Sequence, residues 1–181
     1  MASFLGEFDC RLDTKQRVAL PANLKRQLPP EAEGRLVINR GFEKHLVLYP
    51  FNVWQAISAE INQLNLYRKK NRDFVRYFYR GATELKLDGQ GRLLLPKRLL
   101  DYAEIKDEVV LFAYYNRIEV WAKAHYATML DAAPDDFAEL AEEIMGALPT
   151  SVSLGAPRTG GDMAGDGDDD DEGTGREGDA D

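Results

Sequence analysis

Cysteine and histidine are scarce in this chain of 181 residues, which has one cysteine and two histidines. Because Cys10 is alone, an intrachain disulfide and a cysteine-rich zinc site are excluded. His45 and His125 lie at no recognisable metal-ligand spacing, and the chain has no P-loop, dinucleotide-binding fingerprint or nucleophile elbow. These absences argue against an enzyme, and we expect no cofactor, no metal and no small-molecule substrate.

Long apolar runs are also missing. No stretch approaches the ~20 apolar residues that are needed to span a bilayer. The first residues, MASFLGE, lack the charged and long apolar regions of a secretory signal. We therefore expect no membrane association and a cytoplasmic location.

The most informative feature that is present is an internal repeat. Residues 12–24 read LDTKQRVALPANL, and residues 87–99 read LDGQGRLLLPKRL. The matched positions include aspartate, arginine and proline, which a general preference for apolar residues would not align. Further matches follow at slightly shorter offsets, as expected when loops of duplicated units drift in length. A duplicated unit implies two equivalent surfaces on one chain.

The repeat and the composition divide the chain into five parts. We expect two repeat domains at residues 5–54 and 81–126, a helical connector at 55–80, a C-terminal helix at 127–149 and a Gly/Asp-rich tail at 150–181. The tail has almost no large apolar residue, so it cannot offset its ordering entropy and is expected to be disordered.

Each repeat is predicted to fold as strand, turn, strand, short helix, strand and strand. Alternating and β-branched segments predict strands at 4–12, 17–20, 35–38, 46–49, 108–114 and 118–121. A proline at the first helical position and 3- and 4-residue apolar spacings predict helices at 22–28, 97–103, 123–131 and 135–147, and two helices between 52 and 80. The fold class is therefore α+β.

The net charge of −8 hides an uneven distribution. Residues 150–181 hold ten acids and two bases, whereas residues 1–130 sum to +6. Residues 65–100 alone contain ten bases and three acids. Although the isoelectric point is about 4.9, the body of the protein is basic, which favours a polyanionic partner.

The repeated Asp-x-x-x-Arg motif is the main candidate site. Asp13 and Asp88 are expected to shape turns by accepting backbone hydrogen bonds. Their arginines are either ion-pair partners or contacts to phosphate and guanine. The candidate DNA-binding residues are the two arginines and the polar or basic residues around them, namely Arg11, Lys15, Gln16, Arg17, Lys86, Gln90, Arg92 and Lys97.

A second basic run, YRKKNR at residues 67–72, leaves three interpretations open. It can be a solvated connection between helices, a phosphate contact, or an ion-pairing surface for a neighbouring subunit.

The sequence resembles the MraZ family of bacterial transcriptional regulators, which are built from two SpoVT-AbrB-type swapped-hairpin domains. The matching segments are 4–7, 12–17, 46–50, 54, 72–82, 87–96 and 116–121, and they cover about residues 1–145. The resemblance implies two swapped-hairpin, AbrB-like β-barrel half-domains. It also implies a repressor that binds short direct repeats of double-stranded DNA in its own promoter, upstream of the division and cell-wall gene cluster. A ring-shaped homo-oligomer and a nucleoid-associated cytoplasmic location are further implications.

Two departures from the family pattern stand out. Gln16 occupies a position where the family usually has glycine, and a non-glycine residue there disfavours a positive φ. The tail from about residue 150 lies outside the family pattern. The alternative function is that of an assembly or antitoxin-like module of the same fold, whose basic face meets an acidic protein.

Overall fold

The computed structural model describes residues 3–132 and 137–146. Contacts divide the chain into two units, residues 1–135 and 136–181, which are described separately. The second unit contains α6 (Phe137–Gly146). The C-terminal helix expected at 127–149 therefore corresponds to the end of α5 and to α6, and the tail expected to be disordered lies outside the described residues.

The first unit contains the same order of elements twice. The first copy comprises β1 (Phe4–Arg11), β2 (Arg17–Ala19), α1 (Ala22–Arg26), a 3-10 turn (Pro30–Ala32), β3 (Arg35–Arg40), β4 (His45–Pro50) and α2 (Phe51–Ile61). After α3 (Lys69–Tyr79), the second copy comprises β5 (Thr83–Lys86), β6 (Arg92–Leu94), α4 (Lys97–Tyr102), β7 (Glu108–Tyr115), β8 (Arg117–Ala122) and α5 (Lys123–Asp131). The predicted α+β class is confirmed.

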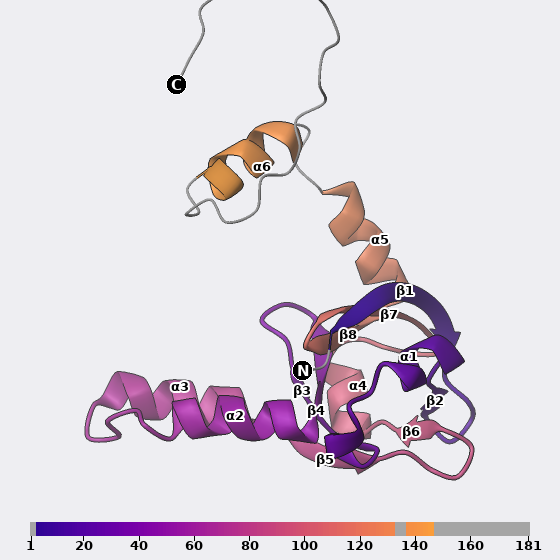
Figure 1. Cartoon of the computed structure of the whole chain (residues 1–181), viewed down its shortest axis with the longest axis horizontal. Coiled ribbons are helices and arrows are strands. Elements are labelled where there is room, and N and C mark those ends of the chain that lie inside the picture. Colours follow the sequence, from indigo (N-terminus) through magenta and orange to yellow (C-terminus); the bar gives the residue numbers. More distant parts are fainter. Residues whose placement is uncertain (1–2, 133–136, 147–181) are drawn as a thin grey trace, which may run out of the picture. The chain divides into compact units, whose positions relative to one another are not determined.

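The two copies exchange their first strands. Six antiparallel strands form one sheet in the order β1-β7-β8-β4-β3-β5, and β2 pairs with β6 in a separate ribbon. Each edge strand thus pairs with a strand of the other copy, β1 with β7 and β5 with β3. Strands β4 and β8 pair with each other at the centre (Figure 1). The order is symmetric about this central pair, so the two copies form an interlaced pseudo-twofold unit.

The main core lies between the sheet and the β2–β6 ribbon. Because strand side chains alternate between faces, Leu46 and Leu48 of β4 point into this core. Val18 and Leu93 lie opposite each other in the ribbon, and both are fully buried. The ribbon therefore covers one face of the sheet like a lid.

The other face of the sheet carries two smaller aromatic clusters. One is formed around Tyr49 and Trp54, beside α2, and the other around Trp121 and Tyr126, beside α5. These residues occupy equivalent places in the two copies. The repeat therefore governs the packing on both faces.

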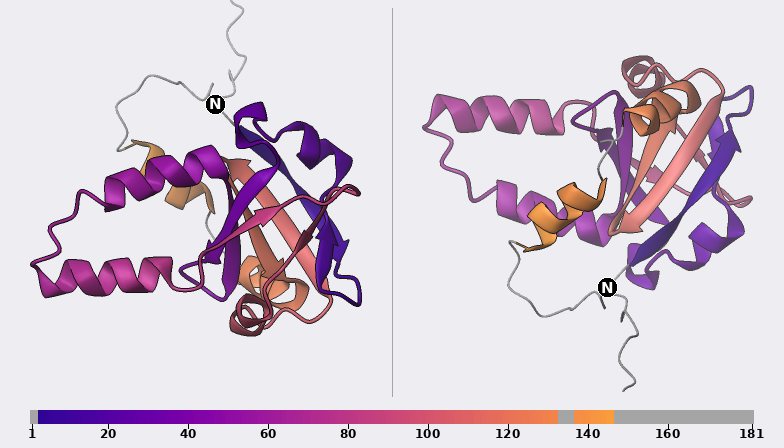
Figure 2. Two further views of the ribbon diagram at one scale, coloured as in Figure 1. Left: turned by 90° about the horizontal axis from the view of Figure 1, so that it is seen from below. Right: turned by 90° about the horizontal axis from the view of Figure 1, so that it is seen from above.

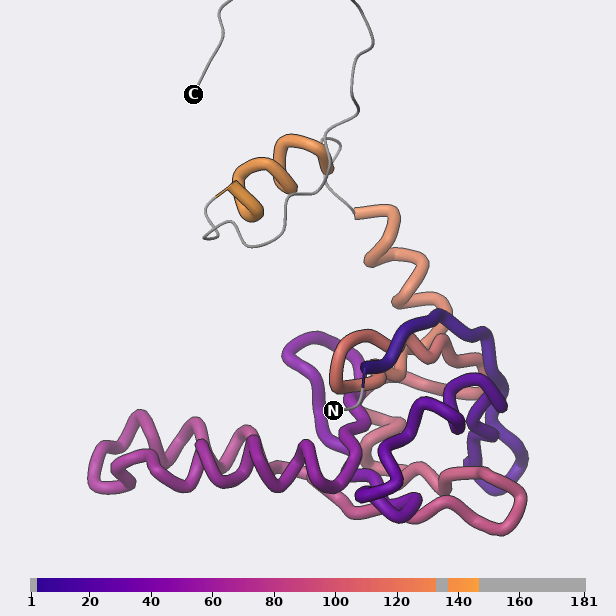
Figure 3. Tube along the Cα trace, in the orientation of Figure 1, coloured from indigo at the N-terminus to yellow at the C-terminus, as the bar shows by residue number. Residues whose placement is uncertain are grey.

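Helices α2 and α3 extend away from the sheet as a hairpin (Figure 2). Only its base is anchored, because Trp54 stacks on Phe78 with ring centroids 5.5 Å apart. The side-chain amide of Asn39 also donates to the Phe78 carbonyl at 2.7 Å. No residue of α3 is fully buried. The chain trace shows the hairpin on the side opposite to β2 and β6 (Figure 3).

Two neighbouring leucines of β6 test this arrangement. Leu93 is fully buried, whereas Leu94 is 57% exposed. Leu93→Ala should lower the free energy of unfolding by about 2–5 kcal/mol, because it leaves a cavity under the ribbon. The control Leu94→Ala should change it by no more than about 0.5 kcal/mol. Urea unfolding measures both, and equal losses would contradict the packing described.

Candidate nucleic-acid interface

The first Asp–Arg turn connects β1 to β2. Oδ1 of Asp13 accepts hydrogen bonds from the backbone N–H groups of Lys15 and Arg17, both at 2.9 Å. Oδ2 accepts a hydrogen bond from Nε of the Arg17 side chain at 2.7 Å, and Nη2 lies 2.6 Å away. These bonds, above all those from Arg17, lower the pKa of Asp13 to about 2. The aspartate therefore fixes both the turn and the arginine.

The second turn, between β5 and β6, repeats this geometry. Oδ1 of Asp88 accepts from the backbone N–H groups of Gln90 and Arg92 at 2.9 Å, and Oδ2 accepts from Arg92 Nε at 2.8 Å. The backbone bond from Arg92 is the main reason why the pKa of Asp88 is lowered. Both arginines are thus ion-pair partners of the turn aspartates. The two Nη groups of Arg92 make no hydrogen bond within the described residues.

The first turn is as regular as the second, although it lacks the glycine. Gln16 has φ 63° and Gly91 has φ 73°, so both adopt the left-handed conformation. Their carbonyl groups accept reciprocal bonds from the other copy, Gln16 from Leu95 at 3.0 Å and Gly91 from Leu20 at 3.1 Å. These bonds hold Gln16 in a conformation that a non-glycine residue rarely adopts alone. The first turn therefore adopts the positive φ at Gln16 although a non-glycine residue disfavours it.

The β2–β6 ribbon places the two turns close together. Arg17 lies opposite Leu94, and Arg92 lies opposite Ala19. The ribbon is three residues long, so its ends are two residue steps apart, roughly 7 Å. The two turns therefore flank one short ribbon at one end of the first unit (Figure 1).

The predicted flanking cations fall into two groups, one that forms an ion pair and one that does not. Arg11 forms an ion pair with Asp107 at 2.7 Å, and both side chains are exposed. Lys15, Lys86 and Lys97 are exposed and form no ion pair within residues 3–132. These lysines are free to contact an anion.

Lys25 was not among the predicted site residues. Its side chain crosses the second turn, so that a Cβ on Gly91 would lie 2.7 Å from Lys25 Nζ. The second turn has Gln90 where the first has Lys15. Lys25, which comes from the first copy, thus supplies a cation to the turn of the second. The strand exchange brings these residues together, and sequence spacing does not indicate it.

The basic run at residues 67–72 does not join this site. It lies at the beginning of α3, on the hairpin that extends away from the turns (Figure 1). Lys69 pairs with Asp73 at 2.7 Å, and Arg72 donates to two carbonyl groups of the preceding loop at 2.8 and 2.9 Å. Two of its cations are therefore used in the hairpin itself.

Within the described residues, no group of three or more His, Cys, Asp or Glu side chains could hold a metal ion. No described helix is both long and apolar enough to cross a membrane.

Comparison with known proteins shows which family most of the chain resembles. A family model described as "MraZ protein, putative antitoxin-like" matches residues 3–77 and again residues 78–147. A protein of Christiangramia forsetii named Transcriptional regulator MraZ is 42% identical over 81% of this chain and 95% of its own length. Proteins of the same name from Flavobacterium psychrophilum and Cytophaga hutchinsonii are 40% and 38% identical, over 81% and 80% of this chain and 94% and 96% of their own lengths.

Alanine substitutions at two glycines of the second turn distinguish the cost of backbone strain from the effect of adding a methyl group. Gly91→Ala should lower the free energy of unfolding by about 1–2 kcal/mol, because an L-residue is strained at φ 73°. Gly89 lies outside the left-handed region, and a Cβ there would meet nothing within 4 Å. Gly89→Ala should therefore change stability by less than about 0.5 kcal/mol. The geometry of the turn is refuted if thermal unfolding ranks the two variants the other way.

The lowered pKa of Asp13 predicts a dependence of stability on pH. Its folded pKa of about 2 lies below the unfolded value of about 4, so its contribution is complete above pH 4 and is lost as the pH falls towards 2. Urea midpoints between pH 5 and 2 should fall less steeply for Asp13→Asn than for the wild type. Asp131→Asn, an exposed residue without an ion pair in the described chain, serves as the control and should follow the wild type. Parallel curves for Asp13→Asn and the wild type would contradict the assignment.

Proposed function

The chain belongs to the MraZ family, and we propose that it is a transcriptional regulator that binds double-stranded DNA. The proposal is supported by relatives that carry the name Transcriptional regulator MraZ and match four-fifths of the chain. The protein acts by binding and not by catalysis. The main supporting observation is the pair of Asp–Arg turns with the same hydrogen-bond geometry at the two ends of one ribbon.

The DNA-binding face is formed by both turns and the β2–β6 ribbon. Asp13 and Asp88 fix the arginines in advance, so little side-chain entropy is lost when DNA binds. The Nη groups of Arg92 remain available for the planar fork that recognises guanine O6 and N7. Exposed lysines around the turns contact phosphates and set the register. The face comprises Arg11, Lys15, Gln16, Arg17, Lys86, Gln90, Arg92 and Lys97, to which we add Lys25.

A single face offers few base contacts, so we propose that several copies act together. Residues 5–54 and 81–126 are the two AbrB-like halves of each DNA-binding unit, 55–80 is a connector, and 127–149 a C-terminal extension. A ring-shaped homo-oligomer presents the same face at intervals, and each further direct repeat then binds at high effective concentration. We propose that these repeats lie in the promoter of the division and cell-wall gene cluster, which is what the resemblance implies. Repression there and a cytoplasmic, nucleoid-associated location complete the proposal.

The family description favours one second candidate, an antitoxin-like module that binds an acidic protein with the same basic face. Both functions use the turns, so the choice of partner is the distinguishing measurement.

Binding of duplex DNA that carries the direct repeats upstream of the protein's own gene tests the proposal. At fixed, moderate salt, Arg92→Ala should weaken binding by about 1–3 kcal/mol, and Arg92→Lys should restore only part of the affinity because the fork is lost. A Lys15→Ala, Lys97→Ala double variant should reduce the slope of log affinity against log salt. Fluorescence anisotropy with labelled duplexes measures all of these values.

Lys70→Ala is the matched control, because this exposed lysine lies on α3, away from the turns. It should leave the affinity and the salt slope unchanged. Asp88→Ala controls for damage to the turn, since it breaks the same ion pair and keeps the guanidinium group. Binding that depends on Lys70 and not on Arg92 would reject the proposed face. Absence of binding to any duplex would favour the antitoxin-like alternative.

A further inference from the structure

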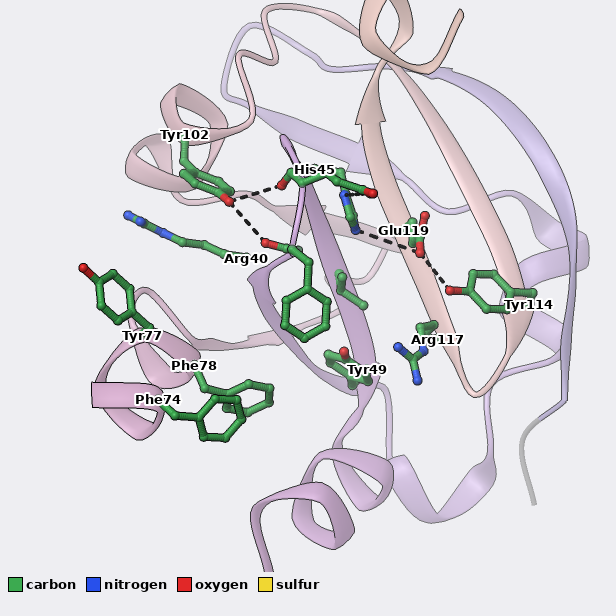
Figure 4. Close-up of a pocket in the computed structure, with 14 residues that line it drawn as sticks. Arg40, His45, Tyr49, Phe74, Tyr77, Phe78, Tyr102, Tyr114, Arg117 and Glu119 are labelled. Carbon is green, nitrogen blue, oxygen red and sulfur yellow. Dashed lines mark hydrogen bonds and ion pairs between the residues drawn. The ribbon is translucent and has the colours of Figure 1, made fainter. Parts of the chain in front are cut away.

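An open cavity of about 480 Å³ lies on the face of the sheet that points away from the β2–β6 ribbon. Alternation along β4 separates the two sites. Leu46 and Leu48 point into the core beneath the ribbon, whereas His45, Val47 and Tyr49 line the cavity (Figure 4). The cavity is therefore distinct from the proposed DNA-binding face. Its volume lies in the range of about 300–1,000 Å³ that is usual for sites of small molecules.

Aromatic rings form much of the cavity wall. Phe74 and Phe78 of α3 lie on one side and Tyr49 of β4 on the sheet side (Figure 4). Phe78 is held from behind by Trp54, on which it stacks. Phe74 remains 42% exposed. Phe74, which stacks on Phe78, therefore presents the open ring face on which a planar apolar group can stack.

Two arginines line the same cavity, and neither forms an ion pair within the described residues. Arg117 lies beside two tyrosine rings, with Cζ 5.6 Å from the Tyr49 centroid and 5.9 Å from that of Tyr114. Its Nε donates only to Asn116 at 3.3 Å. Arg40 lies over the Tyr102 ring at 4.4 Å, and its Nε is buried without a hydrogen-bond partner. Both guanidinium groups are positioned by aromatic contacts and keep unused donors.

The two carboxylates of the cavity do not neutralise these arginines. Glu119 accepts hydrogen bonds from the Tyr114 hydroxyl and from Trp121 Nε1, both at 2.8 Å, and lies 3.9 Å from His45 Nε2. The Glu43 side chain is 71% exposed and faces His45 Nδ1 at 3.6 Å. Glu119 is thus engaged by other groups and Glu43 lies beside His45, so the unpartnered polar groups of the cavity are the arginine donors and Nδ1 of His45. Unused arginine donors select an anion.

We infer that this cavity binds a small planar anion, an aromatic ring that carries a carboxylate or phosphate group. The ring packs against Tyr49, Phe74 and Phe78, and the anionic group is bound by Arg117, with Arg40 at the other rim. The ligand is not a substrate, and no bond changes. It would contact β4 and β8 together, the central pair that joins the two copies. Binding should therefore stabilise the interlaced fold.

The two tryptophans of the chain report directly on this site. Trp54 stacks on Phe78, and Trp121 stacks on His45 with centroids 4.2 Å apart. Titration of the full-length protein with phenyl phosphate and with benzoate should give a saturable change in tryptophan fluorescence, with a dissociation constant of about 1 mM or below for at least one of them. The thermal midpoint should rise with ligand concentration, since the ligand binds the folded state. The probe with the lower dissociation constant identifies the preferred anionic group, phosphate or carboxylate.

Matched variants assign the binding to named groups. Arg117→Gln should weaken binding at least about tenfold, and Phe74→Ala should weaken it for a ring-bearing probe without affecting folding, because Phe74 is part-exposed. Arg35→Gln is the control, since Arg35 also lies over an aromatic ring, Phe51 at 3.6 Å, but outside the cavity. Its variant should bind like the wild type.

Four results would overturn the inference. If phenol bound with the same affinity as phenyl phosphate, the anionic group would not be needed. If inorganic phosphate bound with that affinity, the aromatic ring would not be needed. Unchanged binding by Arg117→Gln, or no response to either probe at 10 mM, would remove the site itself. These titrations contain no DNA, so their failure leaves the proposed DNA-binding function unaffected, and failure to bind DNA leaves this site untouched.

Discussion

Exchange of edge strands between two repeats is the constraint on which the rest of the structure depends. Strand β1 has its partner in β7, and β5 has its partner in β3, so neither copy can complete its sheet alone. The strand-to-strand hydrogen bonds of each first strand are made with the other copy. The ribbon, the core beneath it and the central β4–β8 pair all follow from this exchange. The chain therefore folds as one unit, although its sequence is written twice.

The exchange also explains the regularity of the candidate DNA-binding face. A short ribbon with a turn at each end would be marginal by itself, but here it forms the roof of the main core through Val18 and Leu93. The reciprocal hydrogen bonds that the Leu95 N–H donates to Gln16 and the Leu20 N–H donates to Gly91 then impose one geometry on two different turn sequences. Exposed lysines add positive charge around these turns, and the aspartates hold the arginines in place. Stability and the arrangement of the face thus have the same origin.

Sequence reasoning identified the fold class, the repeat and nearly all elements, because short-range patterns determine them. The α1 helix was expected to reach residue 28 but ends at Arg26, since Pro29 and Pro30 follow closely. Which strand pairs with which was not available from the residues alone, because pairing within a copy and between copies satisfies the same alternation. The contribution of Lys25 to the second turn was missed for that reason. The aromatic cavity was missed because residues 40, 49, 74 and 117 meet only in three dimensions.

The duplication within one chain has a consequence for symmetry. Two identical subunits that clasp each other must present two identical turns, and such a pair is suited to a palindrome. Here the backbone keeps that symmetry, but the side chains break it, with Lys15 and Gln16 in one turn and Gln90 and Gly91 in the other. The side chains of each turn can therefore be substituted independently of those of the other turn. For the proposed DNA-binding function, the covalent link replaces a two-fold symmetric face with a directional one, which suits head-to-tail sites.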